Sequence, residues 1–182
     1  KTMTRESIFK PGNVAVITGA AMGIGRELAL QLAQKGMSVV MADLEGDAFS
    51  AAVSAVEKVA AKGRQTVIGV VTDVSDPDQV VHLKDTALER FGAVHFRANN
   101  AVTRMGRGID ADLAGWRQAM EVNLWGPIYG VRTFLPALLE GAGPAAIVNV
   151  GSKQGITNPP GHPVYNIAKS ALKTYTEALQ HE

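Results

Sequence analysis

Tyr165 and Lys169 stand four positions apart near the end of this 182-residue chain. On a helix, that spacing places two side chains on one face, one turn apart. A phenol beside an ammonium can exchange a proton with a substrate, because the cation favours the phenolate over the neutral phenol. The alternative is an aromatic ring that covers the core with a lysine stem packed beside it. The pair therefore acquires meaning only from the rest of the chain.

A glycine-rich stretch, TGAAMGIG at residues 18–25, follows the first apolar run. Its glycines, Gly19, Gly23 and Gly25, lack a Cβ, so backbone N–H groups and the positive end of a helix could approach a pyrophosphate closely. The alternative is a tight turn whose glycines serve only packing. The setting between a strand and a helix favours phosphate binding.

Two acidic residues end later apolar runs. Asp43 could accept both hydroxyls of an adenosine ribose and would repel a 2′-phosphate. Leu44 and Glu45 follow it, so no cation stands beside it and NAD is favoured over NADP. Its alternative is a solvated acid or a helix N-cap. Asp73 could either contact the adenine or initiate the turn before the next helix.

The elements that would position these residues alternate along the chain. Apolar runs rich in β-branched residues predict strands at 14–18, 38–42, 66–71, 94–98 and 146–150. Helical spacing predicts helices at 23–35, 47–61, 77–91 and 112–139, and a last helix from about Tyr165. This alternation predicts an α/β fold with a parallel sheet covered on both faces. Ligands are then expected beyond the carboxyl ends of the strands.

Composition narrows the possible partners. A formal net charge of +1 favours no nucleic acid. The chain has no cysteine and four dispersed histidines, so we expect neither a disulfide nor a metal site. No stretch reaches the roughly 18 apolar residues of a membrane span, and the first residues lack the apolar core of a signal peptide. We expect one soluble, cytoplasmic domain over residues 1–182.

The ordered set of motifs resembles the short-chain dehydrogenase/reductase family over essentially the whole chain. Residues 18–25 are similar to its TGxxxGxG loop, 99–101 to its NNAG segment and 165–169 to its YxxxK motif. Asn123 and Ser152 stand where the family has an asparagine and a serine of its active site. Each motif is weak alone, but the set in this order is specific.

The resemblance implies a Rossmann-like doubly wound fold and NAD(P)-dependent oxidation of a secondary alcohol or reduction of a ketone. It implies that the catalytic residues are Asn123, Ser152, Tyr165 and Lys169. It implies that the cofactor-binding residues are Gly19, Met22, Gly23, Ile24, Gly25, Asp43, Leu44, Asp73, Val74, Asn99, Ala101, Tyr165 and Lys169. NAD as cofactor and a homodimer or homotetramer are expected. The alternative is an NAD-binding regulatory or scaffold protein with this fold and no turnover.

Several residues depart from the family pattern or stand out from their surroundings. Val102 replaces the glycine of NNAG, which removes the freedom of glycine from that loop. Arg97 occupies an apolar position of the fourth predicted strand, where it would have to bend to the strand edge or meet a carboxylate. Arg104 and Arg107 could meet an acidic substrate, but solvated loop charges are the commoner case.

The long predicted helix contains Pro127, whose missing N–H leaves the carbonyl of Asn123 without its usual helical partner and predicts a kink. In the family, this backbone oxygen is thought to hold a water that links the lysine to solvent; the alternative is a purely structural kink. Family members also run on for roughly another 60–80 residues. We therefore expect that two C-terminal strands and a loop over the substrate are missing here.

Overall fold

The structure, a computed structural model, describes residues 8–61, 65–141 and 143–181. Its strands are β1 (Val14–Thr18), β2 (Ser38–Asp43), β3 (Val67–Val71), β4 (Phe96–Asn99) and β5 (Ala146–Asn149). All pair in parallel, in the spatial order β3-β2-β1-β4-β5. The chain therefore builds outward from β1 in one direction and then crosses to build in the other, as a doubly wound sheet does.

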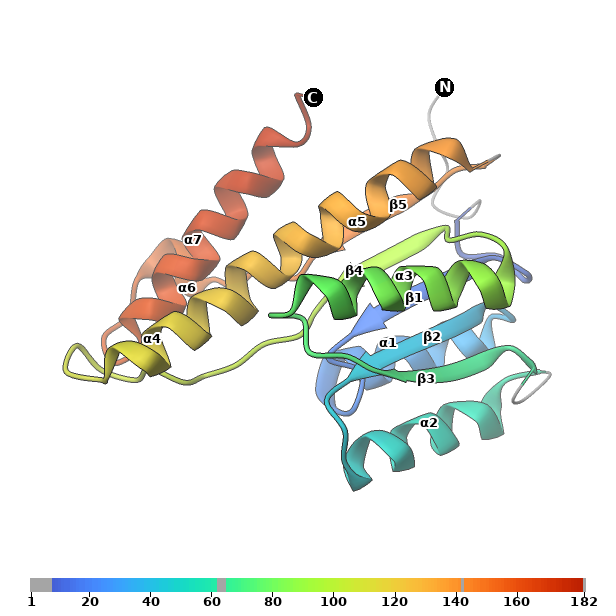
Figure 1. Cartoon of the computed structure of the whole chain (residues 1–182), viewed down its shortest axis with the longest axis horizontal. Helices are drawn as coiled ribbons and strands as arrows, with labels where there is room; N and C mark the ends of the chain where they lie inside the picture. The colour runs from blue at the N-terminus through green and yellow to red at the C-terminus, as the bar shows by residue number, and fades with distance from the viewer. Residues whose placement is uncertain (1–7, 62–64, 142, 182) are drawn as a thin grey trace.

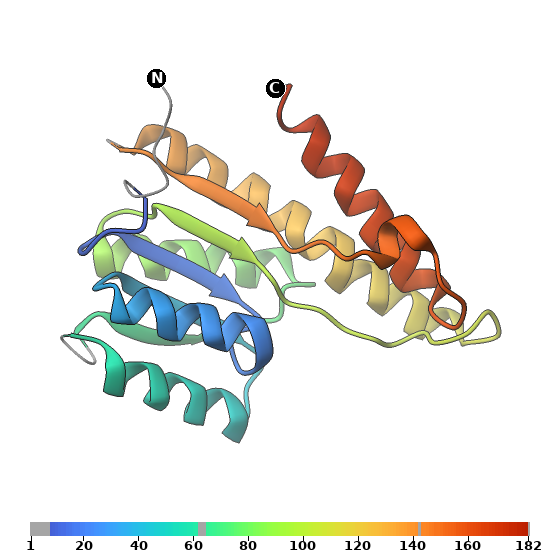
Figure 2. The same ribbon diagram turned by 180° about the vertical axis from the view of Figure 1, so that it is seen from behind.

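Helices cover both faces of this sheet (Figures 1 and 2). The helices of the chain are α1 (Gly23–Gln34), α2 (Asp47–Val59), α3 (Pro77–Phe91), α4 (Leu113–Met120), α5 (Gly126–Glu140), α6 (Gln154–Thr157) and α7 (Pro163–Ala178). A π-helical segment, η3 (Glu121–Trp125), joins α4 to α5. Helices α1 and α2 lie on one face, and α3 and α5 lie on the other. The Rossmann-like α/β fold predicted from the sequence is confirmed.

Local sequence explains why α3 has sharp ends. The Asp76 carboxylate accepts hydrogen bonds from the N–H groups of Asp78 and Gln79, and Pro77 is the first helical residue, where its missing N–H costs nothing. At the other end, Gly92 adopts a left-handed conformation with φ of 77°, and its N–H donates to Leu88.

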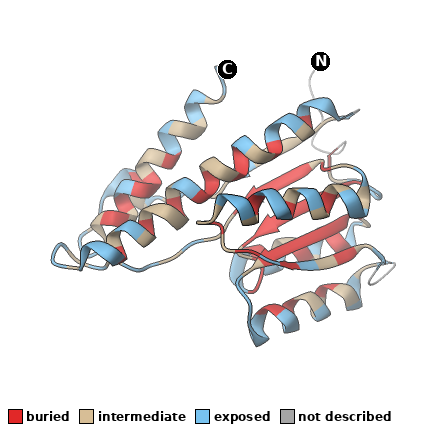
Figure 3. Ribbon diagram, viewed as in Figure 1, coloured by how far each residue is buried: buried red, intermediate tan, exposed pale blue. Residues whose placement is uncertain are grey.

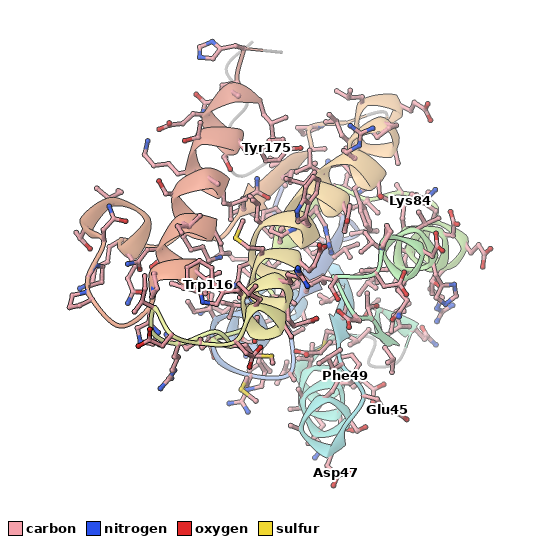
Figure 4. All side chains as sticks on the ribbon, turned by 60° about the vertical axis from the view of Figure 1, so that its left-hand side comes forward. Glu45, Asp47, Phe49, Lys84, Trp116 and Tyr175 are labelled. Carbon is pink, nitrogen blue, oxygen red and sulfur yellow. The ribbon has the colours of Figure 1, made fainter. Side chains whose placement is uncertain are left out.

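The sheet separates two apolar cores, and its strands are the most deeply buried part of the chain (Figure 3). Phe49 of α2 packs in one of them, while Glu45 and Asp47 beside it are exposed (Figure 4). Phe134 of α5 packs in the other. Both faces of β1, β2 and β4 are covered, which explains their nearly continuous apolar sequences, whereas β5 at the edge is only partly buried.

The helix expected over residues 112–139 is not one continuous α-helix. Residues 121–125 form the π-helical segment, in which the N–H of Gly126 donates to the carbonyl of Glu121. Pro127 gives the physical reason, because it has no N–H with which to continue the α-helical ladder to Asn123. A π-helical turn is a common cause of a helix kink. The interruption includes Asn123, whose carbonyl was expected to lack its helical partner, but it takes the form of a π-helical segment that the sequence did not predict.

Arg97 meets neither of the two expectations for it. On β4 it pairs with Val16 of β1 and Ile147 of β5, so it cannot reach a sheet edge. It has no exposed surface, and its guanidinium carbon lies 4.6 Å from the centre of the Phe134 ring. Within the described residues, its Nε and Nη1 atoms have no hydrogen-bond partner. Burial lowers the pKa of Arg97 to about 9.

Replacing this charge should stabilise the fold. Arg97→Met keeps an unbranched side chain against Phe134 and removes a buried charge that has no carboxylate partner among the described residues. We expect the free energy of unfolding to rise by about 1–4 kcal/mol, the range measured when buried ionic groups give way to apolar ones. Urea denaturation measures this free energy. Arg117→Met, at an exposed position of α4, is the control and should change the free energy of unfolding by less than about 0.5 kcal/mol. A destabilised Arg97→Met would mean that the guanidinium has a partner.

Candidate active site

A cleft of about 480 Å³ lies at the carboxyl ends of the strands, where the chain changes direction between β1 and β4. It is lined by the loop after β1, the ends of β2 and β3, and the loop after β4. Among the predicted cofactor-binding residues, those in its lining are Gly19, Met22, Gly23, Ile24, Asp43, Leu44, Asp73, Val74 and Ala101. Gly25, Asn99, Tyr165 and Lys169 are outside the lining.

The glycine loop is tight toward the sheet and open toward the cleft. A Cβ on Gly25 would overlap the carbonyl oxygen of Gly19, so only glycine allows this approach of helix to turn. Gly23 has a positive φ of 56°, and no atom lies within 4 Å of the position its Cβ would take. Met22 at the N-cap of α1 supplies no capping hydrogen bond from its side chain. The first N–H groups of α1 thus face a cleft without a side-chain cap.

Asp43 holds this loop against the end of β2. Its Oδ2 accepts a hydrogen bond from the N–H of Ala21 at 2.7 Å, and its Oδ1 accepts one from the N–H of Leu44 at 2.8 Å. A carboxylate offers about four acceptor positions. Asp43 therefore keeps acceptor capacity directed toward the cleft that it lines.

Asp73 initiates a turn, one of its two predicted roles. Its Oδ1 accepts hydrogen bonds from the N–H and the hydroxyl of Ser75 at 2.9 and 2.7 Å, just before α3. Asp73 also lines the cleft together with Val74. The turn role is thus observed, and a contact with adenine is compatible with it.

The two adjacent asparagines after β4 have different surroundings. Asn99 is buried, and its Nδ2 donates to Asn149 Oδ1 at 2.9 Å, within the fold. Asn100 lines the cleft, and its Nδ2 donates to the carbonyls of Thr18 and Gly19 at 3.0 and 3.1 Å. Asn100 therefore fixes the backbone of the glycine loop. Sequence reasoning did not assign Asn100 this role, because the sequence does not show which of two adjacent asparagine side chains points toward the glycine loop.

Asn123 fixes the loop that follows β4. It is fully buried in η3, its Oδ1 accepts from the N–H of Thr103, and its Nδ2 donates to the Thr103 carbonyl, both at 2.9 Å. Val102 precedes this anchor without strain: apart from glycines, Asn158 alone has a positive φ in the described part of the chain. The loop therefore does not need the glycine that the family pattern has there.

Tyr165 and Lys169 lie on one face of α7, as predicted. The Lys169 Nζ is 5.8 Å from the centre of the Tyr165 ring and donates to the carbonyl of Val150 at 2.8 Å. Lys169 is buried, and this burial lowers its pKa to about 8. Ser152 lies two residues beyond Val150, where its Oγ accepts from the N–H of Gln154 at 3.2 Å. The lysine thus ties α7 to the segment that carries Ser152.

Gly155 brings the Ser152 segment directly onto α7. A Cβ at Gly155 would lie 2.6 Å from the carbonyl carbon of Lys169 and 2.7 Å from the nitrogen of Ser170. Any larger residue would push α6 away from the helix of Tyr165. Sequence reasoning missed Gly155, because a close approach between distant segments leaves no local pattern.

The fold and the site define a doubly wound α/β protein with a glycine-lined cleft at its switch point and with Tyr165 and Lys169 one turn apart on α7. Residues 13–182 match the family model of the short chain dehydrogenases. The chain belongs to this family.

Individual relatives agree with this assignment. The 1-deoxy-11-beta-hydroxypentalenate dehydrogenase of Streptomyces arenae is 38% identical over 169 residues, which are 91% of this chain and 58% of that protein. The trans-4-hydroxycyclohexanecarboxylate dehydrogenase of Sinomonas cyclohexanicum is 34% identical over 179 residues, 96% of this chain and 68% of that protein. The crystal structure of a short chain dehydrogenase/reductase from Burkholderia phymatum in complex with NAD superposes with a TM-score of 0.90 at 40% identity. The superposed part is 97% of this chain and 61% of the Burkholderia phymatum chain.

The chain thus spans about 60% of the length of most of the curated relatives it matches. Across the described ranges, the helices are too short or too polar to cross a membrane. In the same part of the chain, no three His, Cys, Asp or Glu residues come together in a way that could hold a metal ion.

Proposed function

We propose that this protein is an NAD-dependent dehydrogenase that oxidises a secondary alcohol to a ketone, or catalyses the reverse reaction. The observation that carries the proposal is the position of Lys169, which lies beside the Tyr165 ring and holds the strand end next to Ser152. A dinucleotide-binding scaffold needs the glycine loop and Asp43, but it does not need this set.

Residues of the cleft fit NAD. The uncapped N–H groups at the start of α1 and the open space at Gly23 suit a pyrophosphate. Asp43 suits the two hydroxyls of the adenosine ribose. When bound, NAD supplies the acceptor for the hydride that leaves the carbinol carbon. The NAD complex of the Burkholderia phymatum relative supports this choice of cofactor.

Residues of the chain manage the proton. Tyr165, as phenolate, takes the proton of the alcohol hydroxyl and returns it in the reverse reaction. The Lys169 ammonium favours that phenolate, because an opposite charge nearby stabilises the ionised form. Ser152 donates a hydrogen bond to the substrate oxygen and holds it against the phenol. Asn123, through Thr103, keeps the loop after β4 in place beside them.

Two of the relatives are named for alcohols on a cyclohexane ring, cyclohexanol and trans-4-hydroxycyclohexanecarboxylate, and we infer a substrate of that kind. Steady-state assays with NAD and a panel of cyclic secondary alcohols, on the full-length protein, test the proposal. NAD binding without turnover of any alcohol would favour the regulatory or scaffold alternative.

A homodimer or homotetramer stays a prediction, supported by the exposed Trp125 and Leu139 in the η3 and α5 region.

Asp43→Ala should change the choice between the two cofactors. We expect the parent to bind NAD much more tightly than NADP, because a carboxylate facing a 2′-phosphate costs several kcal/mol. The substitution should narrow this preference by at least about tenfold. Calorimetric titration with both cofactors measures it. Glu45→Ala removes the same charge two residues away, on an exposed side chain (Figure 4), and should leave the preference unchanged. Equal dissociation constants for the parent would refute the assignment of Asp43.

A further inference from the structure

Arg104 lies on the loop after β4, and its guanidinium carbon is 5.9 Å from the centre of the Tyr165 ring. Figures 1 and 2 show this loop leaving the sheet and running outward to α4. Tyr165 is thus approached by two cations, the buried Lys169 from its own helix and the exposed Arg104 from the loop. Arg107, three residues further on, makes no such contact in the described part of the chain.

The loop is fixed on both sides of Arg104. Before it, Thr103 makes two hydrogen bonds to the buried Asn123 side chain. After it, Gly106 packs so closely that a Cβ there would lie 3.1 Å from Val164, the neighbour of Tyr165. The N–H of Gly108 then donates to the carbonyl of Gly161 at 3.1 Å, just before α7. These anchors hold the backbone of Arg104 beside the start of the Tyr165 helix.

The guanidinium has unused binding capacity. Arginine presents five N–H donors in a planar fork that matches a carboxylate. Within the described residues, no carboxylate pairs with Arg104, and its contact with Tyr165 is near the outer limit of about 6 Å for a cation–π interaction. Its neighbours Val102 and Met105 are half exposed and line the cleft. One unpaired cation among apolar side chains is the arrangement that orients an amphipathic anion.

We propose that Arg104 binds a carboxylate of the substrate, so that the protein prefers hydroxy acids, or the matching keto acids, over neutral alcohols. The guanidinium takes the carboxylate at one end of a compact molecule, and Tyr165 takes the hydroxyl at the other end. This inference rests on the proposed function, because it places the acid relative to the phenol that removes the proton. Arg107, on the same loop, has no part in it.

Binding and turnover with a matched pair of molecules test this role. In the full-length protein loaded with NAD, calorimetry with cyclohexanecarboxylate measures anion binding without any reaction. We expect Arg104→Met to raise that dissociation constant by about 10- to 100-fold, the usual effect of losing a hydrogen bond to a charged group. Arg104→Lys should keep part of the affinity, because it keeps the charge and loses the fork. Arg107→Met removes the same charge from the same loop and should leave the constant unchanged.

Kinetics with cyclohexanol and trans-4-hydroxycyclohexanecarboxylate separate this role from the general chemistry. Arg104→Met should raise KM for the hydroxy acid and leave kcat and KM for cyclohexanol unchanged. The role of Arg104 would be overturned if the dissociation constant of cyclohexanecarboxylate for Arg104→Met stayed within about twofold of that for the parent. It would also be overturned if Arg104→Met lowered kcat/KM equally for both alcohols. A parent that binds the carboxylate through Arg104 but reduces no NAD with either alcohol would leave the anion site standing and overturn the dehydrogenase.

Discussion

Tyr165→Phe is expected to lower kcat for alcohol oxidation by roughly 10²–10⁴, the usual range for the loss of a positioned acid–base group. The substitution keeps the ring and removes only the ionisable oxygen. In the described part of the chain, no hydrogen bond involves the Tyr165 hydroxyl, so its loss should change neither the free energy of unfolding nor the affinity for NAD appreciably. The rate of NAD reduction with an alcohol that the parent oxidises measures the effect.

Tyr175→Phe is the matched control for this substitution. Tyr175 lies further along the same helix, α7 (Figure 4), and burial raises the pKa of its hydroxyl. Removing that hydroxyl should leave kcat unchanged. A near-parental kcat for Tyr165→Phe would refute the role of Tyr165 as general base, regardless of family membership.

Lys169→Met should impair both turnover and NAD binding. The methionine keeps most of the buried stem but removes the ammonium that lies beside Tyr165 and holds the Val150 carbonyl. We expect kcat to fall by roughly 10²-fold, as for other damage to acid–base catalysis. The affinity for NAD should fall as well, unlike that of Tyr165→Phe, because the family resemblance implies that Lys169 also binds the cofactor. Lys173→Met, an exposed lysine one turn further on, should change neither.

The same variant has a signature in the pH dependence of stability. The folded-state pKa of Lys169, about 8, lies below its ordinary value of 10.5. The charged lysine therefore costs folding free energy below pH 8, and this cost disappears as the pH rises toward 10.5. Relative to Lys169→Met, the parent should gain stability over that interval, which urea denaturation at several pH values measures. Parallel curves for the two proteins would show that Lys169 is not desolvated in solution.

Some elements could be predicted from sequence to the residue, because their ends are encoded locally. The first strand has the bounds predicted for it, and so does α3, which an aspartate and a proline begin and a glycine ends. The fourth strand begins at Phe96, two residues later than predicted. An apolar run shows that a strand is buried, but it does not show where pairing starts.

The cofactor cleft was largely predictable, because its parts follow strand ends and the carboxyl ends of parallel strands share one edge of the sheet. The π-helical segment was not, since an apolar stripe looks alike in α- and π-helical turns. The burial of Arg97 in the sheet also could not be predicted from the sequence. Its burial depends on the register that puts it between Val16 and Ile147, in the interior of the sheet. Gly155 and Arg104 act across contacts between distant segments.

Hydride transfer itself gives the most direct measurement. The full-length protein is mixed with NAD and cyclic secondary alcohols, neutral and carboxylated, that carry deuterium on the carbinol carbon. We expect deuterium to appear in the reduced nicotinamide in step with the ketone, and both products to fall together in Tyr165→Phe. Tight binding of NAD with no deuterium transfer from any of these alcohols would contradict the dehydrogenase and favour a protein that kept the fold and the cofactor without the reaction.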